Sequence, residues 1–250
     1  MTSTKQPMMQ VTGSSNTNST TSRLSIRIPS GQSLHSEVAS WSRKADSTVA
    51  PHPKADALAT NEDSRHLLPE GVATVEITLC GPVVATLPRE MAESLEWGEI
   101  LSSVGLSPAE DEVAVRLDCE GAVALIARLS QEDYSLMEEW RRRGVKVALR
   151  NPLEEVMMAA VVATRRKKNV VLLIEEGCCY AAYAEEHKLH FAEALPLAGE
   201  EQLINLLALL NKDYDLRKAQ FTLCGSDGNG YYKLVKNYFR RVKVAKEKKK

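Results

Sequence analysis

The chain of 250 residues is long enough for two domains of ordinary size, and its charges almost balance. With 32 Lys and Arg against 33 Asp and Glu, it lacks the strong positive field of a dedicated nucleic-acid binder. No apolar run reaches the roughly 18 residues of a membrane-spanning helix, and the polar N-terminus lacks the apolar core of a signal peptide. The five cysteines show no zinc-ribbon spacing and fit a reducing compartment, so we expect a cytoplasmic protein.

The first ordered segment is predicted to follow a polar tail. Residues 1–22 are rich in Ser, Thr and Asn and are expected to be disordered. Apolar and polar residues then alternate over residues 24–28, which predicts a half-buried strand. Residues 29–31 (Pro-Ser-Gly) predict a turn and residues 34–39 a second strand, so the sequence predicts a hairpin at this point.

The rest of the N-terminal half is predicted to contain a loop followed by strands and helices. Residues 41–69 lack periodicity and predict a long surface loop, either functional or an insertion, and we favour an insertion. The elements that follow are strands at 72–79 and 83–87, a helix opened by residues 88–90, a hairpin of strands at 112–117 and 122–129, a helix over 130–143 and a strand at 145–149.

The C-terminal half shows a clearer alternation of elements. Apolar residues at helical spacing over 153–161 predict an amphipathic helix, which ends in the basic run 165–168. The expected elements after it are strands at 169–174, 180–184 and 189–195, a helix at 203–210, a strand at 221–224, a glycine-rich turn at 225–230, a helix at 231–239 and a strand at 242–245.

This order of elements resembles one half of an actin-like ATPase, a fold of two tandem ribonuclease-H-like domains with nucleotide bound in the cleft between them. The resemblance implies an α/β protein with mixed sheets, a first domain over residues 23–150 and a second over residues 151–250. The layout is similar to the cell-division actin homologues and the type IV pilus assembly ATPases. Residues 24–28 and 83–88 also resemble an uncharacterised bacterial family of unknown function, a degenerate branch of the same superfold.

Short motifs carry this resemblance at the expected nucleotide cleft. Residues 172–177 (LLIEEG) take the place of the strand that ends Asp-x-Gly in those families, and residues 195–199 (LPLAG) take the place of the turn before a helix. Residues 223–226 (LCGS) resemble the glycine motif that receives adenosine. The resemblance therefore implies a vestigial nucleotide cleft lined by Gly31, Glu175, Gly177, Gly199 and Gly225.

The chain departs from those families where the chemistry needs a carboxylate. In the superfold an acid at the end of the first strand positions hydrated magnesium against the phosphates. Here residues 26–31 contain no acid and carry Arg27, and in the second half Glu175 replaces the aspartate. Because phosphoryl transfer relies on positioning and electrostatics, losing this anchor removes hydrolysis before it removes binding. We therefore expect a pseudo-ATPase with no catalytic residue, metal or required cofactor, ATP being the one ligand that the cleft suggests.

Three further motifs each have a plain structural interpretation beside a functional one. The glycine-rich residues 225–230 fit either a tight turn or a vestigial contact to an anion, since they lie between a strand and a helix. His187 and His190 suggest a metal site, but on a hairpin turn their side chains diverge. The adjacent Cys178 and Cys179 point to opposite faces of a strand and are interpreted as structural thiols.

Three functions remain open on the sequence. The leading hypothesis is a non-catalytic interaction or scaffold protein whose partner is another protein. The second is a nucleotide-binding switch or weak ATPase that uses Glu175 in place of the aspartate. The third is an RNA- or ribosome-associated accessory protein acting through basic C-terminal residues, which would also suit another anionic surface. These basic residues are Arg240, Arg241, Lys243, Lys246, Lys248, Lys249 and Lys250.

Overall fold

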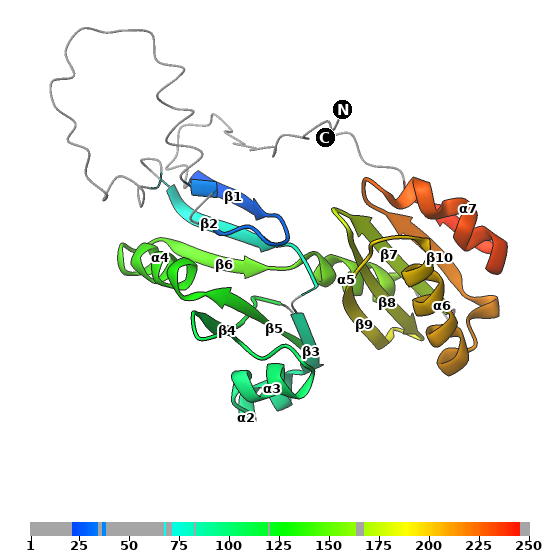
Figure 1. Cartoon of the computed structure of the whole chain (residues 1–250), viewed down its shortest axis with the longest axis horizontal. Helices are drawn as coiled ribbons and strands as arrows, with labels where there is room; N and C mark the ends of the chain where they lie inside the picture. The colour runs from blue at the N-terminus through cyan, green and yellow to red at the C-terminus, as the bar shows by residue number, and fades with distance from the viewer. Residues whose placement is uncertain are drawn as a thin grey trace, which may run out of the picture.

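The computed structural model describes residues 22–34, 37–38, 68, 72–82, 84–119, 121–163 and 168–245 (Figure 1). The predicted tail apart from Ser22, the predicted loop apart from Leu68, and the last five basic-tail positions lie outside the described residues. Among the helices that are described, none is long and apolar enough to cross a membrane.

Two sheets form the N-terminal half of the molecule. One is all parallel, in the order β1-β2-β6, and the other is antiparallel, in the order β3-β5-β4. The strands are β1 (Ser22–Ile28), β2 (Val72–Leu79), β3 (Val84–Pro88), β4 (Glu112–Arg116), β5 (Val123–Ser130) and β6 (Lys146–Arg150). The helices are α2 (Arg89–Ser94), α3 (Trp97–Ser103) and α4 (Gln131–Arg142). Ser130 caps α4 by accepting the Asp133 N–H, which confirms the predicted start of that helix.

The predicted hairpin of residues 24–39 is wrong, whereas the second predicted hairpin is confirmed as β4 and β5. Strand β1 pairs in parallel with β2, with Ile26 opposite Ile77. Instead of a second strand, Leu34 and Val38 have helical backbone, and both side chains are buried. Their spacing of four residues places both on one face of a helical turn, and this spacing prevailed over the weaker alternation of the segment.

A single five-stranded sheet forms the C-terminal half, in the order β11-β10-β7-β8-β9. Strands β7 to β9 are antiparallel, and β10 and β11 run parallel to β7, so the predicted order of elements is confirmed. The strands are β7 (Asn169–Glu175), β8 (Cys178–Glu185), β9 (Lys188–Pro196), β10 (Gln220–Cys224) and β11 (Arg241–Val244). The helices are α5 (Pro152–Val162), α6 (Glu200–Tyr214), the short 3-10 helix η2 (Leu216–Lys218) and α7 (Gly228–Tyr238).

Each half contains three parallel strands of its own, but the two halves differ in what lies beside the first of these strands. In the C-terminal sheet β7 has β10 on one side and the antiparallel β8 on the other. In the N-terminal sheet β1 pairs with β2 on one side, and among the described residues no strand pairs with its other edge. The hairpin that begins the C-terminal sheet therefore has no counterpart in the described part of the N-terminal half.

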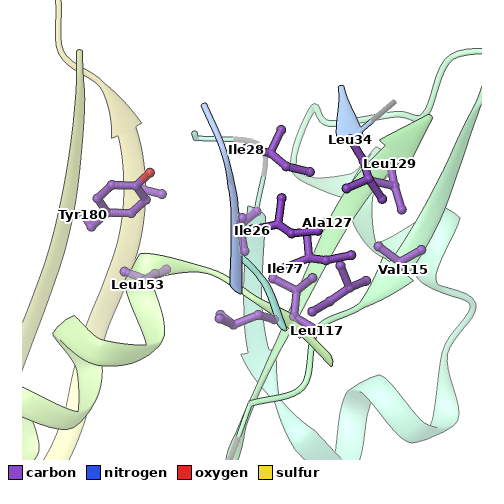
Figure 2. Packing of buried hydrophobic residues seen from close by; sticks show 14 of the residues in the cluster. Ile26, Ile28, Leu34, Ile77, Val115, Leu117, Ala127, Leu129, Leu153 and Tyr180 are labelled. Carbon is purple, nitrogen blue, oxygen red and sulfur yellow. The ribbon is translucent and has the colours of Figure 1, made fainter. Parts of the chain in front are cut away.

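Helix α5 joins the halves through one continuous core. It packs against β7, β8 and β9, and Leu153 belongs to the same buried cluster as Ile26 and Ile77 of the parallel sheet. Figure 2 shows Leu153 and Tyr180 on one side of this cluster and Ile26 and Ile77 on the other. A second core lies on the opposite face of the five-stranded sheet, beneath α6 and α7 (Figure 1).

A buried hydrogen bond crosses between the halves at this core. Tyr180 is 1% exposed, and its hydroxyl accepts the N–H of Gly81 at 2.7 Å. Replacing Tyr180 with Phe leaves that N–H without a partner, so we expect the free energy of unfolding to fall by about 1–3 kcal/mol.

The loss of unfolding free energy is measured by urea denaturation, with circular dichroism as the signal. Tyr183→Phe is the matched control, because the Tyr183 hydroxyl donates to the half-buried Glu185 carboxylate and not to a buried backbone group. We expect the control to lose no more than about 1 kcal/mol. Equal losses in the two variants would contradict a special role for the bond between the halves.

Candidate functional site

The predicted site residue Glu175 ends β7 and forms an ion pair with Arg27 of β1. The guanidinium of Arg27 donates to the Glu175 carboxylate, and its Nε lies 3.8 Å from Oε1 of Glu176. The Glu175 side chain is 17% exposed and that of Arg27 42%. This pair links the first strand of the parallel sheet to the first strand of the five-stranded sheet. The carboxylate that the resemblance assigns to a metal is therefore neutralised by a cation of the same chain.

The surroundings of Arg27 favour its protonated, positively charged form. Burial acts to lower the pKa of the Arg27 guanidinium. Its acidic neighbours, chiefly Cys80 and Glu175, outweigh burial and raise that pKa above its usual value. Arg27 consequently keeps its positive charge across the physiological pH range.

A groove of about 500 Å³ surrounds this ion pair. Its walls come from β1, β2, β6, the start of α5 and β7. The charged residues of the lining are the cations Arg27 and Arg150 and the carboxylates of Glu76, Glu154, Glu155 and Glu175. Arg150 is itself bound to Glu154 at 2.8 Å. With two cations against four carboxylates, the groove repels a polyphosphate.

Three of the five predicted site residues meet at one end of β7. A Cβ on Gly225 would lie 2.4 Å from the carbonyl oxygen of Ile174, the residue before Glu175. The carbonyl of Gly177, in the turn after β7, accepts the N–H of Leu197 at 2.7 Å. Glu175, Gly177 and Gly225 thus lie at the same end of β7.

The other two predicted residues lie farther from this point. Gly199 precedes α6 with an extended backbone (φ 178°), a conformation that any residue adopts. Gly31 is exposed in the turn after β1 with φ 79°. Within the described residues, no hydrogen bond or close contact links Gly31 to the other four, and Arg27 is the residue of β1 that reaches the end of β7.

In the glycine-rich segment 225–230, three backbone N–H groups are bonded to carbonyls of the chain. The N–H of Asp227 donates to Ile174, that of Gly228 to Gly225, and that of Gly230 to Asp227. These groups are therefore already bonded and do not face an anion, and the carboxylate of Asp227 would repel one. Of the two interpretations left open on the sequence, a tight turn fits better than an anion contact.

These features together do not fit ATP with magnesium. Glu175 is paired with Arg27, the groove carries an excess of carboxylates, and three backbone N–H groups of the glycine turn are already bonded to carbonyls. Among the described residues, no three His, Cys, Asp or Glu side chains gather closely enough to hold a metal ion.

The histidine pair diverges, as expected. Nδ1 of His187 lies 3.1 Å from the carbonyl oxygen of Val161 at the end of α5. His190 instead stacks near Tyr183 and Tyr214, with ring centroids 5.5 and 6.2 Å away. Because α5 and these tyrosines lie on opposite faces of the sheet, the two imidazoles do not share a ligand.

Sequence reasoning missed the partners of several charged side chains. Arg27 was noticed as a cation in an unexpected place, but its pairing with Glu175 spans 148 positions, and no local pattern predicts it. The Arg150–Glu154 pair also has a spacing of four, but Arg150 ends β6 and Glu154 lies in the first turn of α5, so the spacing rule for helices does not predict it. Lys168, interpreted as part of a basic run, instead donates to the carbonyl of Tyr214 at the end of α6.

The close approach at Gly225 gives a stability prediction. Gly225→Ala places a methyl group against the Ile174 carbonyl and forces an L residue to φ 88°. We expect a loss of about 2–4 kcal/mol in unfolding free energy, measured by urea denaturation. Gly230→Ala is the control, because nothing lies within 4 Å of the added Cβ in α7. This control should be neutral or stabilising by up to about 1 kcal/mol, and a similar loss in both would contradict the packing argument.

The vicinal cysteines give a second prediction. Cys178 and Cys179 belong to the cores on opposite faces of the five-stranded sheet, and burial raises the pKa of their thiols to about 11 and about 12. Since the thiolate is the reactive form, iodoacetamide at pH 8 should leave both unmodified in the folded protein and alkylate both in urea. Mass spectrometry of the tryptic peptides measures the alkylation, and rapid labelling of these cysteines in the folded chain would contradict the prediction.

Comparison with solved structures identifies the fold. The chain is similar to a Bacteroides thetaiotaomicron protein of actin-like ATPase fold and unknown function, with a TM-score of 0.58, 15% identity, and 70% of this chain and 69% of that chain covered. A type IV pilus biogenesis complex of PilM and PilN has a TM-score of 0.44 and 14% identity, with 78% and 80% covered. No family model and no curated protein sequence matches the chain. The similarity shows that the chain has an actin-like ATPase fold.

Proposed function

We propose that this chain is a non-catalytic interaction protein of the cytoplasm, a pseudo-ATPase that keeps the actin-like architecture without its chemistry. The observation that supports this most directly is the Arg27–Glu175 ion pair. Hydrolysis on this fold needs a carboxylate free to position hydrated magnesium beside the phosphates. Here the cation of β1 occupies that carboxylate, and the buried Cys80, Cys178 and Cys179 are thiols and not disulfides, as suits a reducing compartment.

The core shared by the two halves favours a rigid protein over one that opens and closes in a nucleotide-driven cycle. A nucleotide-driven cycle of domain closure needs two bodies that separate at a hinge. In this chain Ile26, Leu153 and Tyr180 belong to one buried cluster that spans both halves. Separating the halves would expose this apolar surface to water at about 25 cal/mol per Å². A rigid platform that presents its outer surfaces to a partner is consistent with this construction.

The nucleotide test is calorimetric titration of the full chain with ATP and with ADP, each with and without magnesium. We expect no binding up to about 1 mM nucleotide, because the groove carries more carboxylates than cations.

Tight, magnesium-dependent binding would overturn this proposal in favour of a nucleotide-binding switch. In that case Glu175→Ala should abolish both binding and any hydrolysis. Glu155→Ala is the matched control, because Glu155 lines the same groove without an ion pair to Arg27.

A further inference from the structure

Strand β11 ends the five-stranded sheet with an open edge. Among the described residues it pairs with β10 alone, with Val242 opposite Phe221 and Val244 opposite Leu223. The N–H of Ala245 donates to the carbonyl of Leu223 at 2.8 Å, so the backbone of Ala245 faces β10. Since backbone groups alternate in direction along a strand, the N–H and C=O groups of Val242 and Val244 face away from the sheet.

A groove of about 760 Å³ runs between this edge and helix α7. Val242 and Val244 form its apolar side, since both are half-buried against the core beneath α7. Lys243 of the strand and Tyr232 and Lys233 of the helix also line it. An extended segment lying in this groove would have both a backbone ladder and side-chain contacts available to it.

The charged side chains that line this groove are two cations, Lys233 and Lys243. Residues 228–245 contain five cations and no acid, and all five are exposed: Lys233, Lys236, Arg240, Arg241 and Lys243. None of the five is in an ion pair with another described residue. A ligand that is electrostatically complementary to this cluster of cations is acidic.

The opposite edge of the same sheet is not equivalent. Strand β9 contacts β3 of the N-terminal half, and the Thr86 hydroxyl donates to the carbonyl of Ala192 on β9 at 2.9 Å. Of the two edges of this sheet, β11 is therefore the one whose outer side stays unpaired within the described residues, and it lies beside the cationic groove.

We propose that β11 and the adjoining groove dock an extended acidic peptide of a partner protein, which adds to the sheet as a further strand. Exposed strand edges pair with incoming peptides through main-chain hydrogen bonds, and side chains beside the edge supply specificity. This inference rests on the proposed function as an interaction protein and names the surface and the chemistry of the partner.

The strand edge favours a peptide over other polyanions. Val242 and Val244 present both N–H donors and C=O acceptors, and an extended peptide satisfies both, whereas a phosphate backbone offers only acceptors. A second copy of this chain that pairs edge to edge fits less well, because the two β11 strands would bring the same cations, Arg241 and Lys243, against each other.

The probe for this site is a fluorescein-labelled peptide of alternating Glu and Val with blocked termini, and its binding to the full chain is followed by anisotropy. Val244→Pro removes the outward N–H without touching a bond to β10, and proline is tolerated on strand edges. We expect this variant to bind at least about tenfold more weakly. Val244→Thr keeps the N–H and the β-branched shape, and it should bind as the unmodified chain does.

Two further measurements distinguish strand addition from charge attraction. Amide hydrogen exchange at Val242 and Val244 of the unmodified chain should slow when the peptide is bound. This measurement does not depend on the folding of any variant. The double variant Lys233→Glu, Lys243→Glu should weaken binding at least about tenfold, and added salt should also weaken it.

Four outcomes would overturn the proposal. They are no binding of the probe at about 1 mM, equal affinity in the proline and threonine variants with unchanged melting temperatures, no change in exchange at the strand edge, and displacement of the probe by an equally charged single-stranded RNA without loss at the proline variant. The nucleotide titration is independent of these results, so failure here and failure of the pseudo-ATPase proposal are distinguishable.

Discussion

Helix α5 and its buried cap hold the two halves of the molecule in one arrangement. Asn151, 2% exposed, accepts the N–H of Leu153 to begin the helix. The same side chain donates to the carbonyl of Leu79 at the end of β2. One amide group therefore fixes the start of α5 and its position against the parallel sheet. Because a buried polar group without a partner costs about 1–3 kcal/mol, the helix cannot shift without losing one of these bonds.

The charges of the groove follow from that placement. Once α5 lies against β7 to β9, the first strands of the two sheets face each other and bring Arg27 to Glu175. An acid at the position of Arg27 would place like charges across this contact, and a metal ion would be needed to hold them together. With an arginine there, the chain supplies its own counter-charge. The Arg27–Glu175 ion pair thus balances the charge of Glu175 without a metal ion.

Local pattern predicted the C-terminal sheet well, because each strand there is a short apolar run bounded by a turn residue. The segment 34–39 was mispredicted, since Leu34 and Val38 satisfy a helical spacing as well as an imperfect alternation. At the site, sequence singled out Gly225 but not the reason for it, which is the approach of its Cα to the Ile174 carbonyl. Pairings such as Arg27 with Glu175 depend on how the sheets are placed, and that placement is a property of the whole core.

The overall charge of the chain is nearly neutral, but its cations are concentrated near the C-terminal end, and the fold places them on one surface. A net charge of −1 argues against a global field, yet the eighteen-residue stretch 228–245 carries five cations and no acid. Folding places these cations around α7 and β11, on the open edge of the five-stranded sheet. Electrostatic attraction decays over about 8–10 Å at physiological salt, so a ligand at this edge responds to the local cations and not to the net charge. The central groove holds the Arg27–Glu175 ion pair and an excess of carboxylates, and the β11 edge is therefore the surface that we propose for recognition of an acidic partner.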